Sequence, residues 1–326
     1  EQNAAFSDHF IDYPFDLSDV LFIATANRLD TIPPALRDRL EIIEFPGYTE
    51  HEKFHIAKNF LLPKLFKDHG LKKRSVTFQD LAVMDVIRNH TREAGVRELE
   101  RQLATVIRKI TRKLVESSST KTITVGKEAI STHLGPIKYI YDMAEQKDEI
   151  GRATGLAWTP VGGDIMTIEA IRMPGTGKLI LTGQLGIVMK ESAQAALSWA
   201  RAYAARSGVK EDLHKEDIHL HAPAGGVKKE GPSAGIAITT TLVSLFLKKP
   251  IRKEVAMTGE VTLRGKVLGI GGLKEKVLAA HRAGIKTVIA PFENKKDLID
   301  IPKEIQRDIK FVFVKTMDEV LKVALK

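Results

Sequence analysis

The C-terminal half of the chain is organised around one short stretch, Lys229-Glu230-Gly231-Pro232-Ser233-Ala234-Gly235, which the apolar run 236–247 follows. Proline suits the first position of a helix, where its missing N–H group is no loss. The pattern therefore predicts a buried helix with Ser233 in its first turn, beside unpaired backbone N–H groups that could stabilise an oxyanion. Taken alone, a serine at such a place is more often a cap or a turn residue.

A second segment supplies a candidate base for this serine. It reads Gly271-Gly272-Leu273-Lys274-Glu275-Lys276 and places lysines in the first turns of another predicted helix, directly after a glycine turn. A lysine can take a proton from a serine only if its pKa falls toward neutrality, through desolvation and positive potential. A helix N-terminus supplies the potential, and the apolar residues of the same helix could supply the desolvation.

The two segments, with Met257-Thr258-Gly259-Glu260 between them, resemble the peptidase domain of the Lon family of ATP-dependent proteases. The resemblance extends through His219-Leu220-His221 and through residues 154–164. It implies that Ser233 is the nucleophile and Lys276 its base, in an acyl transfer that passes through an acyl-enzyme. It also implies that Thr258, at the end of a predicted strand, orients the nitrogen of the neutral lysine.

The acid before the serine departs from the family. The family usually has Pro-Lys-Asp at this place, and here Lys228-Lys229-Glu230 stands instead. The resemblance implies that Glu230 supports catalysis, although its side chain is one methylene longer than aspartate. Glu169, His219 and His221 lie on matched segments and are expected to line the site, with roles that the sequence leaves open.

Residues 1–48 resemble the end of an AAA+ ATPase core. The pattern predicts a strand, a short helix and a second strand, over residues 20–24, 33–39 and 41–45. Because two strands alone cannot bury their apolar faces, residues 1–48 are expected to continue a larger sheet. The resemblance implies that Asn27 is a polar sensor near the γ-phosphate of ATP and that Arg39 reaches the nucleotide of a neighbouring subunit.

Residues 49–115 have helical periodicity and are similar to the AAA+ small helical domain. Thr49 and Glu52 have the spacing of a capping box at the start of the first helix. Apolar spacing predicts three helices, which run from residue 49 to Gly70, over 80–90 and over 96–114. The resemblance implies that Arg97 is the second sensor of the nucleotide site.

The predicted fold is therefore multidomain. It combines a C-terminal remnant of the α/β AAA+ large subdomain, an all-α AAA+ small domain, a connection and an α+β Lon-type peptidase domain. These parts are predicted over residues 1–48, 49–125, 126–146 and 147–326. In the last part, strands are predicted over 167–171, 179–181, 218–221, 255–258, 287–290 and 311–314, and helices over 188–207 and from 318.

No Gly-x-x-x-x-Gly-Lys-Ser/Thr loop for phosphates occurs in the sequence. Gly175-Thr176-Gly177-Lys178 has the Gly-Lys pair, but Arg172 and Leu179 replace the first glycine and the hydroxyl residue. The chain is interpreted as the C-terminal part of a Lon protease cut inside its ATPase core. It is expected to bind nucleotide poorly and to cleave peptides or unfolded proteins without ATP, whereas the parent protein uses ATP with magnesium.

Three other motifs match by spelling. Ser207-Gly208-Val209-Lys210 reads Ser-x-x-Lys, but its Ser-Asp-Asn and Lys-Thr-Gly partners are absent, so it is interpreted as a helix end with a glycine stop. Residues 231–235 also read Gly-x-Ser-x-Gly, the nucleophile elbow of α/β-hydrolases, but that elbow follows directly on a strand, and here a loop is predicted before the serine. His51-Glu52-Lys53-Phe54-His55 spells the zincin motif, but Glu52 is already explained by the capping box and no third ligand follows at a set spacing. No metal is therefore predicted.

Composition limits the remaining classes. The 326 residues are 43% hydrophobic and 28% charged and contain no cysteine, which excludes disulfides and thiol chemistry. No membrane-length apolar run or signal-peptide pattern occurs, so a cytoplasmic protein is expected. A net charge of +9 would suit a weak nucleic-acid binder, although aromatic residues make up only 6% and form no basic stripe. Arg39 implies a ring of subunits in the parent protein, which the family resemblance sets at six.

Overall fold

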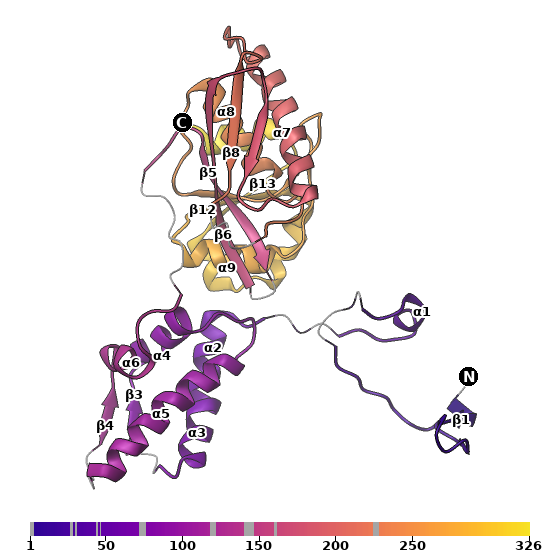
Figure 1. The fold of residues 1–326 in the computed structure, drawn as a ribbon, viewed down its shortest axis with the longest axis vertical. Coiled ribbons are helices and arrows are strands. Elements are labelled where there is room, and N and C mark those ends of the chain that lie inside the picture. The colour runs from indigo at the N-terminus through magenta and orange to yellow at the C-terminus, as the bar shows by residue number, and fades with distance from the viewer. Residues whose placement is uncertain are drawn as a thin grey trace. The chain divides into compact units, whose positions relative to one another are not determined.

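A computed structural model describes residues 3–26, 29, 31–43, 45, 47–71, 76–117, 122–139, 147–159, 162–223 and 228–326 (Figure 1). The chain forms two compact units, Glu1–Pro46 and Gly47–Lys326. Each unit is described by itself.

The N-terminal unit contains little regular structure. Its elements are the 3-10 turn η1 (Asn3–Ala5), the antiparallel pair β1 (Phe6–Ser7) and β2 (Pro14–Phe15), and the helix α1 (Pro34–Arg37). The helix α1 confirms the predicted helix, but the two predicted strands are wrong for the described residues of 20–24 and 41–45. Leu21 and Ile23 are 84% and 85% exposed, and among the described residues of this unit no strand pairs with their backbone.

Helices and a small sheet form the first part of the second unit. The three predicted helices are present as α2 (Glu50–Ile56) with the π-turn η2 (Ala57–Leu61) and α3 (Leu62–Asp68), as α4 (Asp80–Asp85) with η3 (Val86–His90), and as α5 (Arg97–Ser117). The capping box is confirmed: Glu52 N–H donates to Thr49 Oγ1 at 3.1 Å, and Thr49 N–H donates to Glu52 Oε2 at 2.7 Å.

Two further elements of this part, a strand and a helix, were not predicted, whereas the small strand predicted over 122–125 is present. A short strand, β3 (Val76–Phe78), pairs in parallel with β4 (Ile123–Val125), and the helix α6 (Lys127–Leu134) follows. Ile130 of α6 is fully buried in the same hydrophobic core as Leu99 and Leu103 of α5. The segment predicted as a connection, 126–146, thus begins with a helix that packs on the helical core, and the predicted domain boundaries stay predictions.

A seven-stranded mixed sheet forms the second part. Its strands are β5 (Arg152–Thr159), β6 (Gly162–Pro174), β7 (Leu179–Thr182), β8 (Glu216–His221), β9 (Val255–Met257), β12 (Thr287–Pro291) and β13 (Lys310–Val314), in the order β13-β12-β9-β5-β6-β8-β7. The pairs β5–β6 and β6–β8 are antiparallel and the other neighbours are parallel. All six predicted strands are present, and β5 is an addition. The prediction of a multidomain protein with a mixed helix-and-sheet C-terminal part is confirmed.

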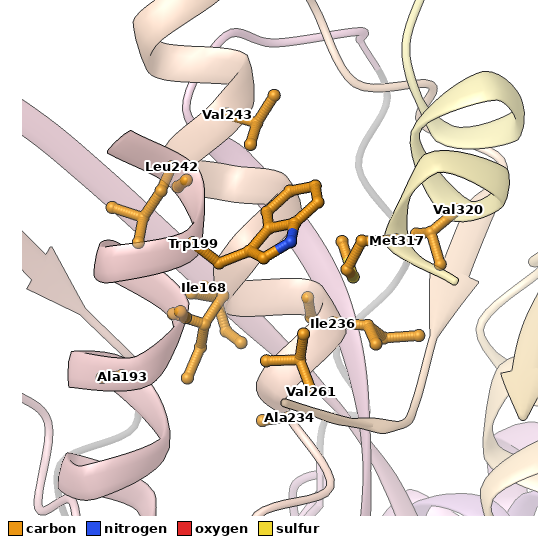
Figure 2. Packing of buried hydrophobic residues seen from close by; sticks show 14 of the residues in the cluster. Ile168, Ala193, Trp199, Ala234, Ile236, Leu242, Val243, Val261, Met317 and Val320 are labelled. Carbon is orange, nitrogen blue, oxygen red and sulfur yellow. The ribbon is translucent and has the colours of Figure 1, made fainter. Parts of the chain in front are cut away.

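Helices cover both faces of this sheet, as the alternation of its side chains shows. In β9, Val255 and Met257 belong to one hydrophobic core, whereas Ala256 between them belongs to the other. The first core is closed by α7 (Ile187–Arg206), α8 (Gly235–Leu247) and α11 (Met317–Ala324), and the second by α9 (Leu273–Arg282) and α10 (Lys303–Asp308). Figure 2 shows Trp199 of α7 packed among α8 side chains and Met317 of α11.

Candidate active site

Ser233 lies in a tight turn, two residues before helix α8 begins at Gly235. The prediction that it occupies the first helical turn is therefore wrong by two residues. Gly231 has φ +96°, a conformation that favours glycine, and Gly235 N–H donates to Pro232 O at 2.9 Å, so the chain closes one turn before the helix starts. Within the described residues, neither Ser233 N–H nor Ala234 N–H donates a backbone hydrogen bond.

The end of strand β9 holds this turn in place. Gly259 N–H donates to the carbonyl oxygen of Ser233 at 2.8 Å, and Thr258 Oγ1 donates to the same oxygen at 3.2 Å. Thr258 itself is fully buried, and its N–H group donates to Ile289 O of β12. The serine is therefore fixed to the C-terminal edge of the sheet by the two residues that follow β9. Gly259 had no predicted role, although glycine next to a strand is a sign of close backbone approach.

Lys276 lies in the first turn of α9, as predicted. The glycine before this helix, Gly272, has φ +67°, and its carbonyl oxygen accepts the N–H group of Lys276 at 3.2 Å. The side chain of Lys276 is only 2% exposed and lies next to the buried Leu273 and Val277. Burial lowers the pKa of Lys276 from 10.5 to about 8, against a smaller opposing effect of the Glu275 carboxylate.

Ser233 and Lys276 come from opposite faces of the sheet. Ser233 precedes α8 of the first core, and Lys276 belongs to α9 of the second. The serine turn is bonded to the residues that follow β9, and α9 packs on the adjacent strands β5 and β6 at the same edge. Among the described residues, no hydrogen bond joins the two side chains.

Glu230 contacts the start of a different helix. A Cβ atom built on Gly186 would lie 1.8 Å from Glu230 Oε2, and Val188 N–H donates to Glu230 Oε1 at 3.2 Å. The carboxylate therefore occupies the N-terminus of α7, where negative charge is favourable. The hydrogen bond with Lys228 Nζ, 3.2 Å away, lowers the pKa of Glu230 below its usual value, so this group is ionised at neutral pH.

The two histidines of the matched segment share one threonine. Thr182 Oγ1 of β7 lies 2.9 Å from His219 Nε2 and 2.7 Å from His221 Nδ1, and Glu169 of β6 stands opposite His221 in the strand register. Thr182, His219 and His221 therefore form a polar cluster on the last two strands of the sheet, β7 and β8, next to β6.

The residues predicted at a nucleotide site are distributed over the two units, each of which is described by itself. Asn27 lies outside the described residues. Arg39 is exposed in the turn after α1 of the N-terminal unit, and Arg97 is the exposed first residue of α5 in the second unit. No cofactor site is shown by the part of the chain that the structure describes.

The alternative motifs have these positions. His51 and His55 lie on α2 with their Nε2 atoms 3.0 Å apart, and the described residues contain no group of three or more metal-ligating side chains. The strand before the serine, β8, ends at His221, so no described strand leads directly into the nucleophile elbow. In the described part of the chain, no helix has both the length and the apolar character to cross a bilayer.

Comparison with known proteins places this geometry in a family. The Lon protease (S16) C-terminal proteolytic domain matches residues 124–326, and the Lon protease AAA+ ATPase lid domain matches residues 67–123. All of the chain aligns with Lon protease of Dictyoglomus thermophilum at 55% identity, with Lon protease 1 of Bacillus subtilis at 54% and with Lon protease of Chloroflexus aggregans at 53%. The chain spans about two fifths of the length of these relatives, at 41%, 42% and 40%. It belongs to the Lon protease (S16) family and carries the AAA+ lid and the serine proteolytic domain of that family.

Proposed function

We propose that Ser233 and Lys276 are the catalytic dyad of an endopeptidase. The observation that carries this proposal is the burial of Lys276 in the first turn of α9, which lowers its pKa to about 8. A lysine in water is almost wholly protonated at neutral pH and cannot accept a proton. At pH 8 about half of the Lys276 side chains would be neutral, which suits a general base.

In the proposed reaction, Ser233 Oγ attacks the carbonyl carbon of a peptide bond while its proton passes to Lys276 Nζ. The C–N bond then breaks, the proton on Nζ goes to the leaving amine, and an acyl-enzyme remains. Neutral Lys276 next takes a proton from water as the water oxygen attacks the ester carbon. The ester C–O bond then breaks, the proton passes from Nζ to Ser233 Oγ, and the carboxylic acid product leaves. The N–H groups of Ser233 and Ala234, which are not used in the backbone ladder, are the proposed donors to the oxyanion.

Thr258 and Glu230 support the dyad in this proposal. The Thr258 hydroxyl donates its hydrogen to Ser233 O, so its oxygen lone pairs remain able to accept a hydrogen from neutral Lys276 Nζ. Glu230 ties the residues before the serine to the start of α7. A hydrogen bond between the two catalytic side chains is expected once substrate is in place, because catalytic bonds often tighten only then.

Cleavage of a fluorogenic peptide by the purified chain tests the dyad. Ser233→Ala and Lys276→Met are each expected to abolish cleavage, and Lys276→Arg is expected not to restore it, because arginine keeps its proton. The wild-type rate should rise with pH through about 8. Lys274→Met on the same helix and Ser207→Ala at the exposed end of α7 are matched controls that should keep full activity. Activity in either dyad variant would refute the assignment.

We further propose that this peptidase belongs to an ATP-dependent protease for unfolded, damaged and regulatory proteins, a cytoplasmic hexamer that uses ATP with magnesium. The similarity to proteins named Lon protease over the whole chain supports this. The 326 residues themselves lack a phosphate-binding loop, so they are proposed to cleave peptides without ATP, and Arg39 and Arg97 are proposed as parts of an incomplete nucleotide site.

A further inference from the structure

The end of the β5–β6 hairpin lies directly on the helix that carries Lys276. Gly163 of β6 stands opposite Trp158 of β5 in the register of this hairpin. A Cβ atom built on Gly163 would lie 1.9 Å from the carbonyl oxygen of Glu275 and 2.9 Å from the backbone nitrogen of Lys276. The hairpin backbone therefore touches the peptide group that joins these two helix residues, with no room for any side chain between them.

The opposite strand touches the residue just before the same helix. A Cβ atom built on Gly272 would lie 2.9 Å from Cδ1 of the Trp158 ring. Gly272 is the residue with positive φ from which α9 starts, and its carbonyl oxygen accepts the N–H group of Lys276. Both strands of the hairpin end thus contact the first turn of α9, one through Trp158 and one through Gly163.

The far end of α9 holds the hairpin as well. Arg282, the last residue of this helix, donates from Nη2 to the carbonyl oxygen of Gly163 at 2.8 Å, and its side chain is about one fifth exposed, at 22%. Gly163 is therefore bonded to the end of α9 through its carbonyl group and pressed against the start of α9 through its Cα. Contacts from Glu275 and from Arg282, seven positions apart on α9, therefore meet at one residue of the hairpin.

The residue after Gly163 links the hairpin end to the helical part of the same unit. Asp164 Oδ2 lies 2.5 Å from Arg92 Nη2, which precedes α5, and Arg282 Nε lies 3.8 Å from Glu50 Oε1 of α2. The hairpin end and α9 are therefore each in contact with a charged side chain from the helical part.

We propose that the end of the β5–β6 hairpin positions the catalytic lysine, with Gly163 and Arg282 as positioning residues that set where the first turn of α9 lies. This inference rests on the proposed role of Lys276 as the base. Its physical reason is that a buried lysine on a short helix has few contacts of its own to fix its nitrogen. A displacement of about 1 Å in a catalytic group can lower a rate about a hundredfold.

Displacement of α9 would also change how far Lys276 is shielded from water. The charged groups around this helix turn are Glu275 on α9, Asp164 on β6, Arg282 at the end of α9, and Glu293 and Asp297 on the 3-10 segment η4 (Phe292–Asp300). Of these only Glu275 shifts the pKa of Lys276, and burial outweighs it. A helix pushed away from the hairpin admits water, so the pKa of Lys276 should rise toward 10.5.

The test is Gly163→Ala, with Gly95→Ala as the matched control. Gly95 has a φ that any residue can adopt, and the nearest atom to its added Cβ is Glu93 Oε2 at 4.0 Å, so this variant should behave like the wild type. Gly163→Ala is expected to lower kcat/KM for a fluorogenic peptide at pH 8 about a hundredfold, mainly through kcat. The rise of the rate with pH should also move to higher pH. An unchanged pH profile with unchanged kcat in folded Gly163→Ala protein overturns the proposal.

Arg282 gives a second test if Gly163→Ala fails to fold. Arg282→Gln should lower kcat and move the pH profile in the same direction by a smaller amount, and Arg282→Lys, which can still donate to Gly163 O, should restore most of the loss. Equal behaviour of the two Arg282 variants contradicts the positioning role. The dyad is judged separately: if Lys276→Met stays active, the proposed function fails, whereas an inactive Lys276→Met beside normal Gly163 and Arg282 variants refutes only the positioning.

Discussion

The side chain of Lys276 has only 2% of its surface exposed, and burial lowers its pKa from 10.5 to about 8. The folded chain therefore binds fewer protons than the unfolded chain between pH 8 and 10.5, and its stability rises with pH across that window. Below pH 8 the full cost of holding a buried ammonium group is present. One pKa unit corresponds to about 1.4 kcal/mol, so this cost is on the order of 3 kcal/mol.

Lys276→Met removes that cost and fills a similar volume. We expect this variant to be more stable than the wild type at pH 7, by up to about 3 kcal/mol, with the difference shrinking toward zero near pH 10.5. Urea unfolding followed by tryptophan fluorescence measures it, because the two tryptophans, Trp158 and Trp199, both lie in the sheet part of the chain. Lys274→Met should show no such pH-dependent gain. A loss of stability in Lys276→Met at pH 7 would mean that Lys276 is not held in an unfavourable environment.

For single residues, the sequence predicted which side chains form the site better than it predicted which groups they contact. The place of the lysine in the first turn after a glycine turn was predictable from the local sequence. The serine was predicted two residues too far into its helix, because the turn that Gly235 N–H closes on Pro232 O comes before the helix. The hydrogen bond from Thr258 to the carbonyl group of Ser233 was not predictable, since it depends on how β9 and the serine turn approach each other. The same holds for Glu230, whose partner Val188 lies 42 positions earlier in the chain.

Among the elements, the end of α8 depends on one buried hydroxyl group. Ser244 is fully buried, its Oγ accepts the N–H group of Gly151 at 3.0 Å and donates to Lys249 O at 2.5 Å. Ser244→Ala leaves both backbone groups without this partner, so we expect a loss of about 1–3 kcal/mol in the free energy of unfolding.

The Ser244 prediction has a control on the neighbouring helix. Ser198 of α7 is exposed, and its Oγ bonds only within its own helix, to Gln194 O at 3.0 Å, so Ser198→Ala should change stability by less than about 0.5 kcal/mol. Urea unfolding of both variants gives the comparison. Peptide cleavage by folded Ser244→Ala should stay at the wild-type level. Equal stability of the two variants would show that the Ser244 hydroxyl does not stabilise the end of α8.

Strands were predicted correctly where the segment pairs with neighbouring strands of the same unit. The strand around 287–290 is present because β9 and β13 pair with it on either side. The run 20–24 is also mostly apolar, but it lies in a unit whose only described strand pair has two residues a side, and it forms no strand and is exposed. The strand β3, which was not predicted, is three residues long, which is too short for a period of two to be recognised.

For the whole molecule, nucleotide dependence is the property that the sequence addresses most directly. The 326 residues contain no Gly-x-x-x-x-Gly-Lys-Ser/Thr motif, whose backbone would cradle phosphates. We therefore expect this chain to hydrolyse no ATP, to cleave short or unstructured peptides at a rate that ATP and magnesium do not change, and to leave stably folded proteins uncut. Peptide cleavage with and without ATP, together with titration calorimetry, measures this. Tight ATP binding, or ATP-stimulated degradation of a folded substrate, would contradict it.

The ion pair between Arg92 and Asp164 joins the helical part of the second unit to the start of β6, next to Gly163. The two side chains are 39% and 26% exposed, and pairs of this kind contribute about 0.2–1 kcal/mol and weaken with salt. If the end of the β5–β6 hairpin positions Lys276, loss of the Arg92–Asp164 ion pair should lower the rate of peptide cleavage. We expect Arg92→Gln and Asp164→Asn each to lower kcat/KM by up to about fivefold at low salt, since that factor corresponds to about 1 kcal/mol.

A double-mutant cycle tests whether the Arg92 and Asp164 substitutions act through their shared ion pair or independently of each other. The Arg92→Gln, Asp164→Asn double variant should be no slower than either single one, and the swap of Arg92→Asp with Asp164→Arg should recover much of the activity. All of these differences should shrink at about 1 M salt, where the Debye length falls to about 3 Å. Arg101→Gln is the control, because that side chain is 79% exposed and pairs only with Glu98 on its own helix. Losses that add in the double variant, or that persist unchanged in high salt, would show that the helical part does not act on the lysine helix through this contact.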